Sequence, residues 1–302
     1  MQPISEVGEH KLIARIRERA GKAPSWVEIG IGDDAAVIAP ERGELDVVTT
    51  DCQIEGVHFD RRWSSMREIG AKALAVNLSD LAAMGASPRA ATLSLALPPS
   101  LALEDFDALV DGFLALAKPA GLTLVGGNLS NSPGPIVIDV TLIGTARRRR
   151  ILTRSGGAAR HLLYVTGMLG AASANLQTHK RSDERTLLLL KLSRELSANR
   201  VVSACMDLSD GLADGVSQMA TASGTGAVVL SSKVPVHADA TLEHALRGGE
   251  DYELLFAVPP RRRRGFEKIA GRLTPVACIG ELTKDPSLRL DEGPLGGGFA
   301  HF

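Results

Sequence analysis

Residues 72–98, KALAVNLSDLAAMGASPRAATLSLALP, join a helical pattern to a strand-like one. The helical pattern starts near Met66 and ends near Met84, and the strand-like run RAATLSLALP covers residues 89–98. Further strand-like runs cover residues 26–31, 45–50, 122–127 and 135–146, and a second helical pattern covers about residues 103–118. Because strands and helices are mixed, the sequence predicts an α/β or α+β fold rather than an all-α or all-β one.

The same mixture begins again after residue 160. Strand-like runs cover residues 161–167, 226–230, 252–258 and 276–280, and helical patterns cover about residues 184–199 and 210–222. Between the halves lies ARRRRILTRSGGAAR, residues 146–160, which is polar, charged and contains glycine. We therefore expect two domains of ordinary size, residues 1–148 and residues 149–302, joined through this segment.

The composition is typical of a globular protein. Of 302 residues, 44% are hydrophobic and 23% are charged, and the formal net charge of −1 gives no general attraction to nucleic acid or anionic lipid. No apolar run approaches the ~20 residues of a membrane span. The N-terminus lacks the apolar core of a signal peptide, and Leu12, Ile13 and Ile16 instead fit one face of a helix. These features predict a cytoplasmic protein that binds neither membrane nor nucleic acid.

Two arginine runs, Arg147–Arg150 and Arg261–Arg264, each follow a predicted strand. The simpler interpretation is a solvated turn or the start of a helix. A patch for a polyanion is the alternative, but no interleaved aromatic residues support nucleic-acid binding. The three cysteines, Cys52, Cys205 and Cys278, are far apart and indicate neither a disulfide framework nor a structural zinc site.

Acidic residues recur where predicted elements begin or end. Asp80 is the hardest to explain, because Ala, Leu, Val and Met surround it on the helix and a buried carboxylate needs a partner. The others lie beside strands or helix starts: Asp33, Asp34, Asp51, Asp207, Asp210, Glu250 and Asp251. Taken singly, each also fits a helix cap or a solvated turn. Together they suit a hard divalent cation, and Mg²⁺ fits best because it combines a few carboxylates with water and substrate phosphates.

The stretch GIGDDAAVI, residues 30–38, sets Asp33 beside Asp34 after a strand that we expect to be buried. It matches the glycine pattern of a dinucleotide-binding turn, but two carboxylates would repel a pyrophosphate unless metal ions stood between them. The sequence contains neither a P-loop nor the protein-kinase motifs. A nucleotide would therefore be held largely through metals, while glycine turns at Gly126–Gly127 and Gly248–Gly249 offer backbone N–H groups.

Six motifs together resemble one enzyme family. In chain order they are GIGDDAAVI, TTDCQIEGVHF, KALAVNLSDLAAMGA, LTRSG, MDLSDGL and GGEDYEL. This set resembles the thiamine-monophosphate kinase family, within the ATP-binding superfamily that includes aminoimidazole ribonucleotide synthetase. The resemblance implies that superfamily's two-domain fold, with a mixed N-terminal sheet and helices and a C-terminal α/β domain. The N-terminal domain would bind metal and ATP and form the dimer, and the C-terminal domain would complete the ATP and substrate site.

The resemblance also implies a reaction. A homodimer would transfer a phosphoryl group from ATP to thiamine monophosphate, giving thiamine diphosphate and ADP, with several Mg²⁺ ions neutralising the phosphates. We expect direct in-line transfer without a phosphoenzyme. The acceptor is already a phosphate oxyanion, so no side chain is expected to act as a general base.

Matching the motifs residue by residue assigns the expected site. The expected metal ligands are Asp33, Asp34, Thr49, Thr50, Asp51, Asp80, Asn128, Asp207 and Asp210. The expected ATP contacts are Gly127, Asn128, Arg154 and Ser209, and the expected substrate contacts are His58, Glu250 and Phe299. Asn128 departs from the family, which usually has an aspartate there; its amide oxygen can coordinate a hard cation, but without the charge.

Two other functions stay open at this point. The chain could be another ATP-dependent enzyme of the same superfamily that acts on a different phosphate or amide. Alternatively, it could be a Mg-nucleotide-binding homologue with impaired catalysis, which the substitution at Asn128 motivates. The EGVHF and GGEDYEL elements favour thiamine phosphate over the first of these.

Overall fold

The computed structural model describes residues 2–174 and 183–297. The chain divides into two compact units, one made of residues 1–81 and 87–147 and the other of residues 82–86 and 148–302. We call them the first and the second unit and describe each by itself. The metal, ATP and dimer roles expected of the two domains stay predictions.

The first unit is built on a four-stranded sheet. In spatial order its strands are β3 (Leu45–Ile54), β6 (Val137–Ala146), β4 (Ser87–Leu97) and β5 (Thr123–Asn131). β6 runs antiparallel to both of its neighbours, whereas β4 and β5 are parallel. The mixed N-terminal sheet is therefore confirmed.

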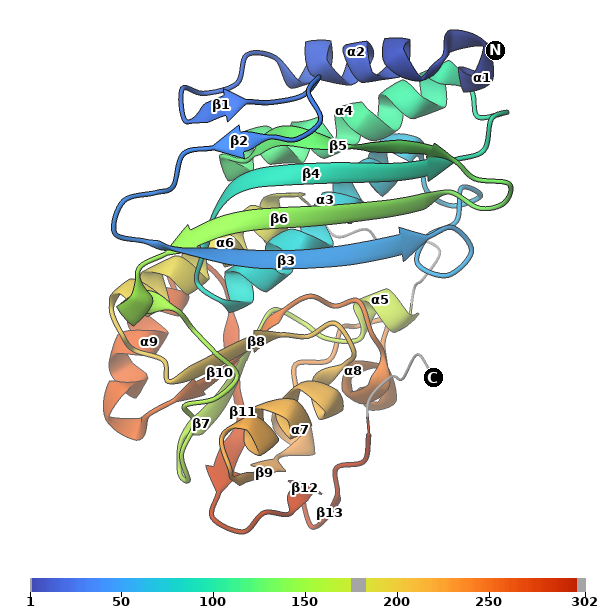
Figure 1. The fold of residues 1–302 in the computed structure, drawn as a ribbon. Helices are drawn as coiled ribbons and strands as arrows, with labels where there is room; N and C mark the ends of the chain where they lie inside the picture. Colours follow the sequence, from blue (N-terminus) through green and yellow to red (C-terminus); the bar gives the residue numbers. More distant parts are fainter. Residues whose placement is uncertain (1, 175–182, 298–302) are drawn as a thin grey trace. The chain divides into compact units, whose positions relative to one another are not determined.

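Two long helices, α3 (Met66–Ala83) and α4 (Leu103–Ala120), lie against one face of this sheet (Figure 1). β6 shows the resulting alternation: Val140 and Leu142 are fully buried, whereas Asp139 and Thr141 between them are partly exposed. We call the buried side the helix face of the sheet and the other side its outer face.

The two helices approach each other closely through glycines. A Cβ atom added at Gly70 would lie 1.9 Å from the carbonyl oxygen of Leu109, and one at Gly112 would lie 1.9 Å from that of Arg67. Only glycine fits at either position, so these two residues set how near α3 and α4 can pack.

The N-terminal segment packs on α4. It forms α1 (Ile4–Val7), α2 (Glu9–Ala20) and an antiparallel pair of short strands, β1 (Val27–Ile29) and β2 (Val37–Ile38). Arg19 of α2 forms ion pairs with Asp107 and Asp111 of α4 at 2.9 Å and 3.0 Å. The expected N-terminal helix is confirmed, with Leu12 buried.

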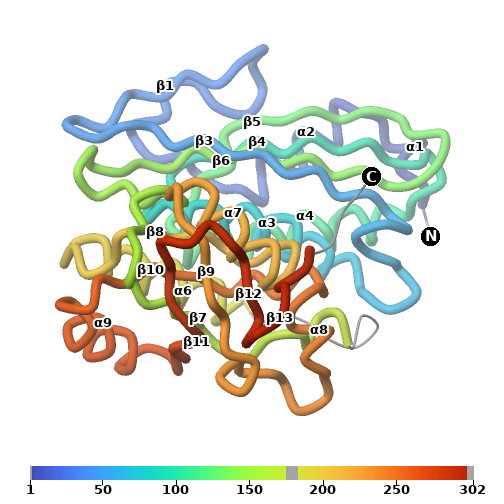
Figure 2. The backbone as a smooth tube through the Cα atoms, turned by 90° about the horizontal axis from the view of Figure 1, so that it is seen from below, coloured from blue at the N-terminus to red at the C-terminus, as the bar shows by residue number. Residues whose placement is uncertain are grey.

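The second unit contains a seven-stranded sheet, and β8 and β13 lie at its opposite edges (Figure 2). In spatial order the strands are β13 (Gly293–Pro294), β12 (Leu288–Leu290), β9 (Gly226–Val229), β11 (Val276–Thr283), β7 (Leu162–Thr166), β10 (Leu254–Val258) and β8 (Ala204–Asp207). Its α-helices are α5 (Ala171–Ala174), α6 (Asp183–Ala198), α7 (Leu212–Ala222), α8 (Leu242–Arg247) and α9 (Arg263–Ala270). All strand pairs are antiparallel except β9 with β12.

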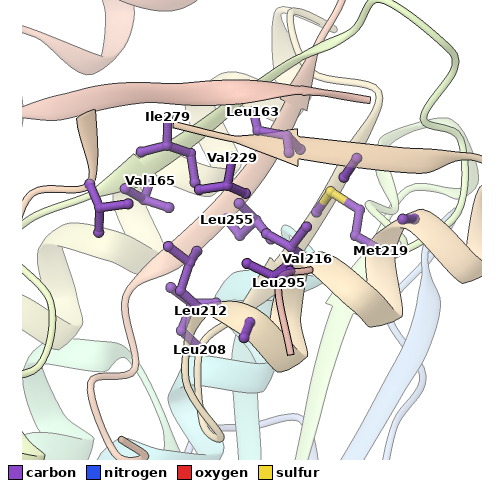
Figure 3. Packing of buried hydrophobic residues seen from close by; sticks show 14 of the residues in the cluster. Leu163, Val165, Leu208, Leu212, Val216, Met219, Val229, Leu255, Ile279 and Leu295 are labelled. Carbon is purple, nitrogen blue, oxygen red and sulfur yellow. The ribbon is translucent and has the colours of Figure 1, made fainter. Parts of the chain in front are cut away.

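The core of the second unit lies between α7 and the sheet. Leu212 and Val216 of α7 pack with Leu163, Val229 and Leu255 from three strands, and each of these side chains is fully buried (Figure 3). α7 starts directly after the MDLSDG motif, so this packing fixes one end of that motif.

Two sequence expectations need correction or completion. The strand expected at residues 26–31 is only β1, and Ile29 is 41% exposed, so the strand before GIGDDA is short and not buried. The arginine runs lie in short 3₁₀ helices, η1 (Arg148–Arg150) and η3 (Pro260–Arg262), with a third, η2, at Ser231–Lys233. The second run leads into α9, as the simpler interpretation expects.

None of the helices in the described ranges combines the length and hydropathy needed to cross a bilayer.

Candidate functional site

In the first unit Asp80 is bonded by a threonine of β3. Thr49 pairs across β3 and β6 with the buried Leu142, so its side chain points to the helix face. Its Oγ1 donates a hydrogen bond to Oδ2 of Asp80 on α3 at 2.5 Å. Asp51, two residues further along β3, lies on the same face. The structure therefore brings Thr49, Asp51 and Asp80 to one side of the sheet.

Thr50 and Asn128 lie on the outer face instead. The Oγ1 of Thr50 donates to the carbonyl oxygen of Val140 at 3.1 Å. Asn128 pairs with Ser94 of β4, which in turn pairs with Asp139 on the outer face, and its Nδ2 donates to Oγ of Ser130 at 2.9 Å. The side chains of Thr50 and Asn128 are thus separated by the sheet from the Thr49–Asp80 pair.

Gly127 lets β5 approach β4 closely just before Asn128. A Cβ atom at Gly127 would lie 1.9 Å from the carbonyl oxygen of Leu93, so no other residue fits there. Gly127 itself is exposed, which leaves its backbone accessible.

The GDD carboxylates lie in an exposed turn between β1 and β2. Asp33 and Asp34 are both exposed, and the backbone N–H of Asp34 donates to Oδ1 of Asp33 at 2.9 Å. Facing water relieves the repulsion between the two charges. The turn belongs to the first unit, and the described residues hold no ion pair with either carboxylate.

The EGVHF segment forms a tight loop after β3 that orients His58. The backbone N–H of Ile54 donates to Nδ1 of His58 at 3.1 Å, and Nζ of Lys72 on α3 donates to its carbonyl oxygen at 2.6 Å. Because Nδ1 accepts this hydrogen bond, a neutral imidazole here carries its proton on Nε2. The bond also fixes the orientation of the His58 ring.

In the second unit the two acidic motifs lie side by side. β8 ends at Asp207, which is 5% exposed, and β8 pairs with β10 directly after the GGEDYE segment. The backbone N–H of Glu250 donates to the carbonyl oxygen of Ser209 at 2.7 Å, and that of Tyr252 donates to the carbonyl oxygen of Leu208 at 2.8 Å. Residues 207–210 and 249–252, about forty positions apart in sequence, therefore form one paired structure.

The backbone of this paired structure is strained at two residues. Glu250 has φ 69° and Tyr252 has φ 49°, in the left-handed region that residues with side chains rarely adopt. Such conformations persist only where the surroundings hold them, and they are concentrated at functional sites. The Oγ of Ser209 donates to Oδ2 of Asp210 at 2.6 Å, so these two polar groups of the MDLSDG motif are already bonded to each other.

Arg154 lies beside α7 in the same unit. Its guanidinium donates to Oε1 of Gln218, and Nε2 of Gln218 donates to Oδ2 of Asp214. Burial, and secondly the charge of Asp210, raise the pKa of Asp214. Sequence reasoning missed Asp214 and Gln218, although Asp214 lies only four residues after Asp210, in the first turn of α7.

The donor groups fit a magnesium ion better than a softer metal. In residues 2–174 and 183–297 no three histidine, cysteine or acidic side chains converge as a closed metal cage. The groups that do lie together are carboxylate and hydroxyl oxygens, as in Thr49 with Asp80 and Ser209 with Asp210. Mg²⁺ is bound in this way, by one or two carboxylates completed by waters and phosphates. Phe299 lies outside the described residues.

Comparison with known proteins identifies both halves of the chain. Residues 32–146 match the N-terminal domain of AIR synthase related protein, and residues 145–292 match its C-terminal domain. The thiamine-monophosphate kinase of Rhodopirellula baltica is 36% identical, over 91% of this chain and 89% of the relative.

Solved structures agree. The thiamine-monophosphate kinase of Stenotrophomonas maltophilia K279a has a TM-score of 0.80 and 35% identity, over 94% of this chain and 96% of that one. A structure described as AaThiL complexed with AMPPCP and TMP has a TM-score of 0.75 and 28% identity, over 100% and 99% of the two chains. The two-domain, mixed α/β organisation is thereby confirmed. The chain belongs to the thiamine-monophosphate kinase family.

Proposed function

We propose that this protein phosphorylates thiamine monophosphate with ATP, giving thiamine diphosphate and ADP. The observation that carries the proposal is the paired structure of residues 207–210 and 249–252, which unites the MDLSDG and GGEDYE motifs in a strained conformation. The solved relative that holds AMPPCP, an ATP analogue, together with TMP supports the same pair of substrates.

The described contacts suggest a role for each polar group. His58 would offer Nε2–H to an anionic oxygen, because its Nδ1 is already engaged by the backbone of Ile54. Arg154 would meet the phosphates of ATP, with Gln218 orienting its guanidinium. Ser209 and the exposed backbone at Gly127 would contact ATP, and Glu250 would contact the thiamine part of the acceptor. Phe299 stays a predicted substrate contact.

Mg²⁺, when bound, would neutralise the charge of the phosphates on both reactants. On the helix face of the first unit, Thr49, Asp51 and Asp80 would hold it, and in the second unit Asp207 and Asp210 would do so. The exposed turn of Asp33 and Asp34 supplies further carboxylate oxygens. Thr50 and Asn128, on the outer face, would need a separate ion or would contribute through their backbone.

The transfer would be direct. The acceptor oxygen of thiamine monophosphate is already charged, so no proton has to be removed before attack, and no side chain acts as a general base. The protein would instead align the two phosphates in line and exclude water. No phosphoenzyme forms in this scheme.

We also propose a homodimer, which the family resemblance implies. The outer face of the first unit's sheet offers a surface for a second copy, since Val48 there is 64% exposed. The cytoplasmic location expected from the sequence stays a prediction.

The test is to incubate the purified protein with MgATP and thiamine monophosphate and to separate the products by chromatography. Formation of thiamine diphosphate in step with ADP supports the proposal. A panel of other phosphate and amide acceptors distinguishes it from a different reaction of the same superfamily, which would give ADP only with another acceptor.

A catalytically impaired homologue is the second candidate, because Asn128 brings no charge to its site. Its amide is hydrogen-bonded to Ser130 and lies on the outer face, away from Asp80. This candidate predicts ATP binding without turnover, and recovery of turnover in Asn128→Asp. Full activity of the natural protein would exclude it.

A further inference from the structure

In the GGEDYE segment, residues with a strained backbone alternate with buried carboxylates. Glu250 and Tyr252 adopt the strained left-handed conformation, whereas Asp251 and Glu253 are 9% and 7% exposed. Buried carboxylates must be paired or hydrogen-bonded. Asp251 accepts a hydrogen bond from the backbone N–H of Gly170 at 2.7 Å, through its Oδ2.

Glu253 is held by three donor groups. The Nε of Arg185, on α6, donates to Oε1 of Glu253 at 2.7 Å, and Nη2 of Arg185 donates to Oε2. The hydroxyl of Thr166, at the end of β7, also donates to Oε2 and accepts from the backbone N–H of Leu254 at 2.9 Å. The planar guanidinium of an arginine can donate to both oxygens of a carboxylate, which fixes the orientation of the carboxylate as well as its distance.

The backbone around this ion pair leaves little space. A Cβ atom at Gly167 would lie 2.7 Å from both Nη2 of Arg185 and Cδ of Glu253, at a φ of 64°. Arg185 also donates through Nη1 to the hydroxyl of Thr274. Glu253 is thus fixed by residues from α6, β7 and the loop before β11.

The position of Glu253 determines the strained pair beside it. Its carbonyl oxygen accepts from the backbone N–H of Leu208 at 2.8 Å, and the next bonds in the same ladder join Tyr252 to Leu208 and Glu250 to Ser209. Residues 207–210 lie between β8 and α7, and residues 249–252 lie between α8 and β10. The side-chain anchor at Glu253 therefore fixes the β10 end of the segment, and the backbone ladder connects that end to Glu250.

We propose that Arg185 and Glu253 are positioning residues, which hold Glu250 in its left-handed conformation for the acceptor substrate. This rests on the proposed function, in which Glu250 contacts thiamine monophosphate. Neither Arg185 nor Glu253 is expected to touch a substrate. Their loss would release Glu250 and leave the ATP contacts of Ser209 and Arg154 in place.

The test compares Arg185→Lys and Glu253→Gln with a matched control, Glu267→Gln. Arg185→Lys keeps the positive charge but cannot donate to both oxygens of Glu253 in the fixed geometry of a guanidinium. This variant still tests the proposal if Glu253→Gln does not fold. Glu267 likewise accepts from an arginine and a hydroxyl, Arg263 at 2.9 Å and Tyr164 at 2.7 Å, but it lies in α9. Two kinds of experiment are made. Steady-state kinetics give KM and kcat for each substrate, and hydrogen exchange is measured at the backbone amides of Glu250 and Tyr252.

We expect KM for thiamine monophosphate to rise on the order of tenfold or more in both variants, with KM for ATP nearly unchanged. The amides of Glu250 and Tyr252 should exchange correspondingly faster. Glu267→Gln should change neither quantity. Unchanged exchange at Glu250, or an equal rise in KM for both substrates, would overturn the positioning role. If the natural protein has no thiamine-phosphate kinase activity, the proposed function fails, and the exchange measurement still decides whether the pair holds the segment.

Discussion

At the scale of single residues, the hydrogen bond from Thr49 to Asp80 joins a strand to a carboxylate on a largely apolar helix. The bond joins Oγ1 to Oδ2 at 2.5 Å. A hydrogen bond to a charged group contributes more than one between neutral groups, and its removal leaves a poorly solvated acceptor.

We predict that Thr49→Val destabilises the fold by about 1–3 kcal/mol, because valine matches threonine in shape but cannot donate to Asp80. The same variant should lose most of its turnover if Thr49 and Asp80 share a metal. Urea unfolding and initial rates at varied Mg²⁺ measure the two effects. Thr49→Ser, which keeps the hydroxyl, is the control, and equal stability of the Val and Ser variants would argue against the bond.

His161 gives a prediction about pH. Burial, followed by the charges of Arg261 and Arg262, lowers the pKa of His161 below its ordinary value of 6.5. As the pH falls, the unfolded chain therefore takes up this proton before the folded protein does. The contribution of His161 to stability is complete above pH 6.5 and decreases as the pH falls toward the folded pKa.

Measured unfolding free energies should accordingly depend less on pH in His161→Gln than in the natural protein, between about pH 5 and 7. Arg261→Gln should raise the pKa of His161, as followed by NMR of the ring protons. A pKa at or above the ordinary value in the natural protein would show that neither burial nor the neighbouring guanidinium groups lower it.

At the scale of elements, the crossing of α3 and α4 shows what periodicity predicts and what it leaves open. The patterns at about residues 66–84 and 103–118 correspond to α3 and α4 within a few residues; α4 has an apolar stripe, whereas α3 is apolar on most sides. Their close approach at Gly70 and Gly112 was not predicted. It depends on contacts between segments that are distant in sequence.

We predict that Gly112→Ala destabilises the first unit by about 1–3 kcal/mol or more, because its Cβ would lie 1.9 Å from the carbonyl oxygen of Arg67. Thermal unfolding measures the loss. Gly134→Ala is the control, since a Cβ there meets nothing within 4 Å. Similar melting temperatures for the two variants would mean that the helices can separate without loss.

Short elements were predicted less completely than long ones. β3 continues to Ile54, beyond the expected end at residue 50. The last four residues were missed because the polar residues Asp51 and Gln53 point to the helix face, which reverses the usual hydropathy alternation. β8 and the two strands at the far edge, β12 and β13, have two to four residues each and carry too little pattern to be detected. β8 matters most, since it carries Asp207.

At the scale of the whole molecule, the sequence does not reveal which of the motifs meet within a unit. The pairing of MDLSDG with GGEDYE depends on β8 lying next to β10, which no local pattern reveals. The same holds for the separation of Thr50 and Asn128 from Asp80, which follows from strand register. The site roles of all the expected metal, ATP and substrate contacts stay predictions.

Oligomeric state is testable at this scale. Sedimentation of the natural protein should give twice the chain mass of 31.8 kDa. Val48→Glu, which puts a charge on the outer face of the first unit's sheet, should shift the protein to a monomer. Val57→Glu is the control, because Val57 is similarly exposed, at 67%, but lies in the EGVHF loop. A dimer that tolerates Val48→Glu would place the interface elsewhere.

The most direct test of the proposed reaction follows the transferred group itself. Protein, Mg²⁺, thiamine monophosphate and ATP labelled in its γ-phosphate are mixed, and the label is traced in the products and in the protein. We predict that the label appears in the terminal phosphate of thiamine diphosphate, one for each ADP formed, with none attached to protein. Release of label as inorganic phosphate, or ADP formation that does not depend on thiamine monophosphate, would contradict the assignment.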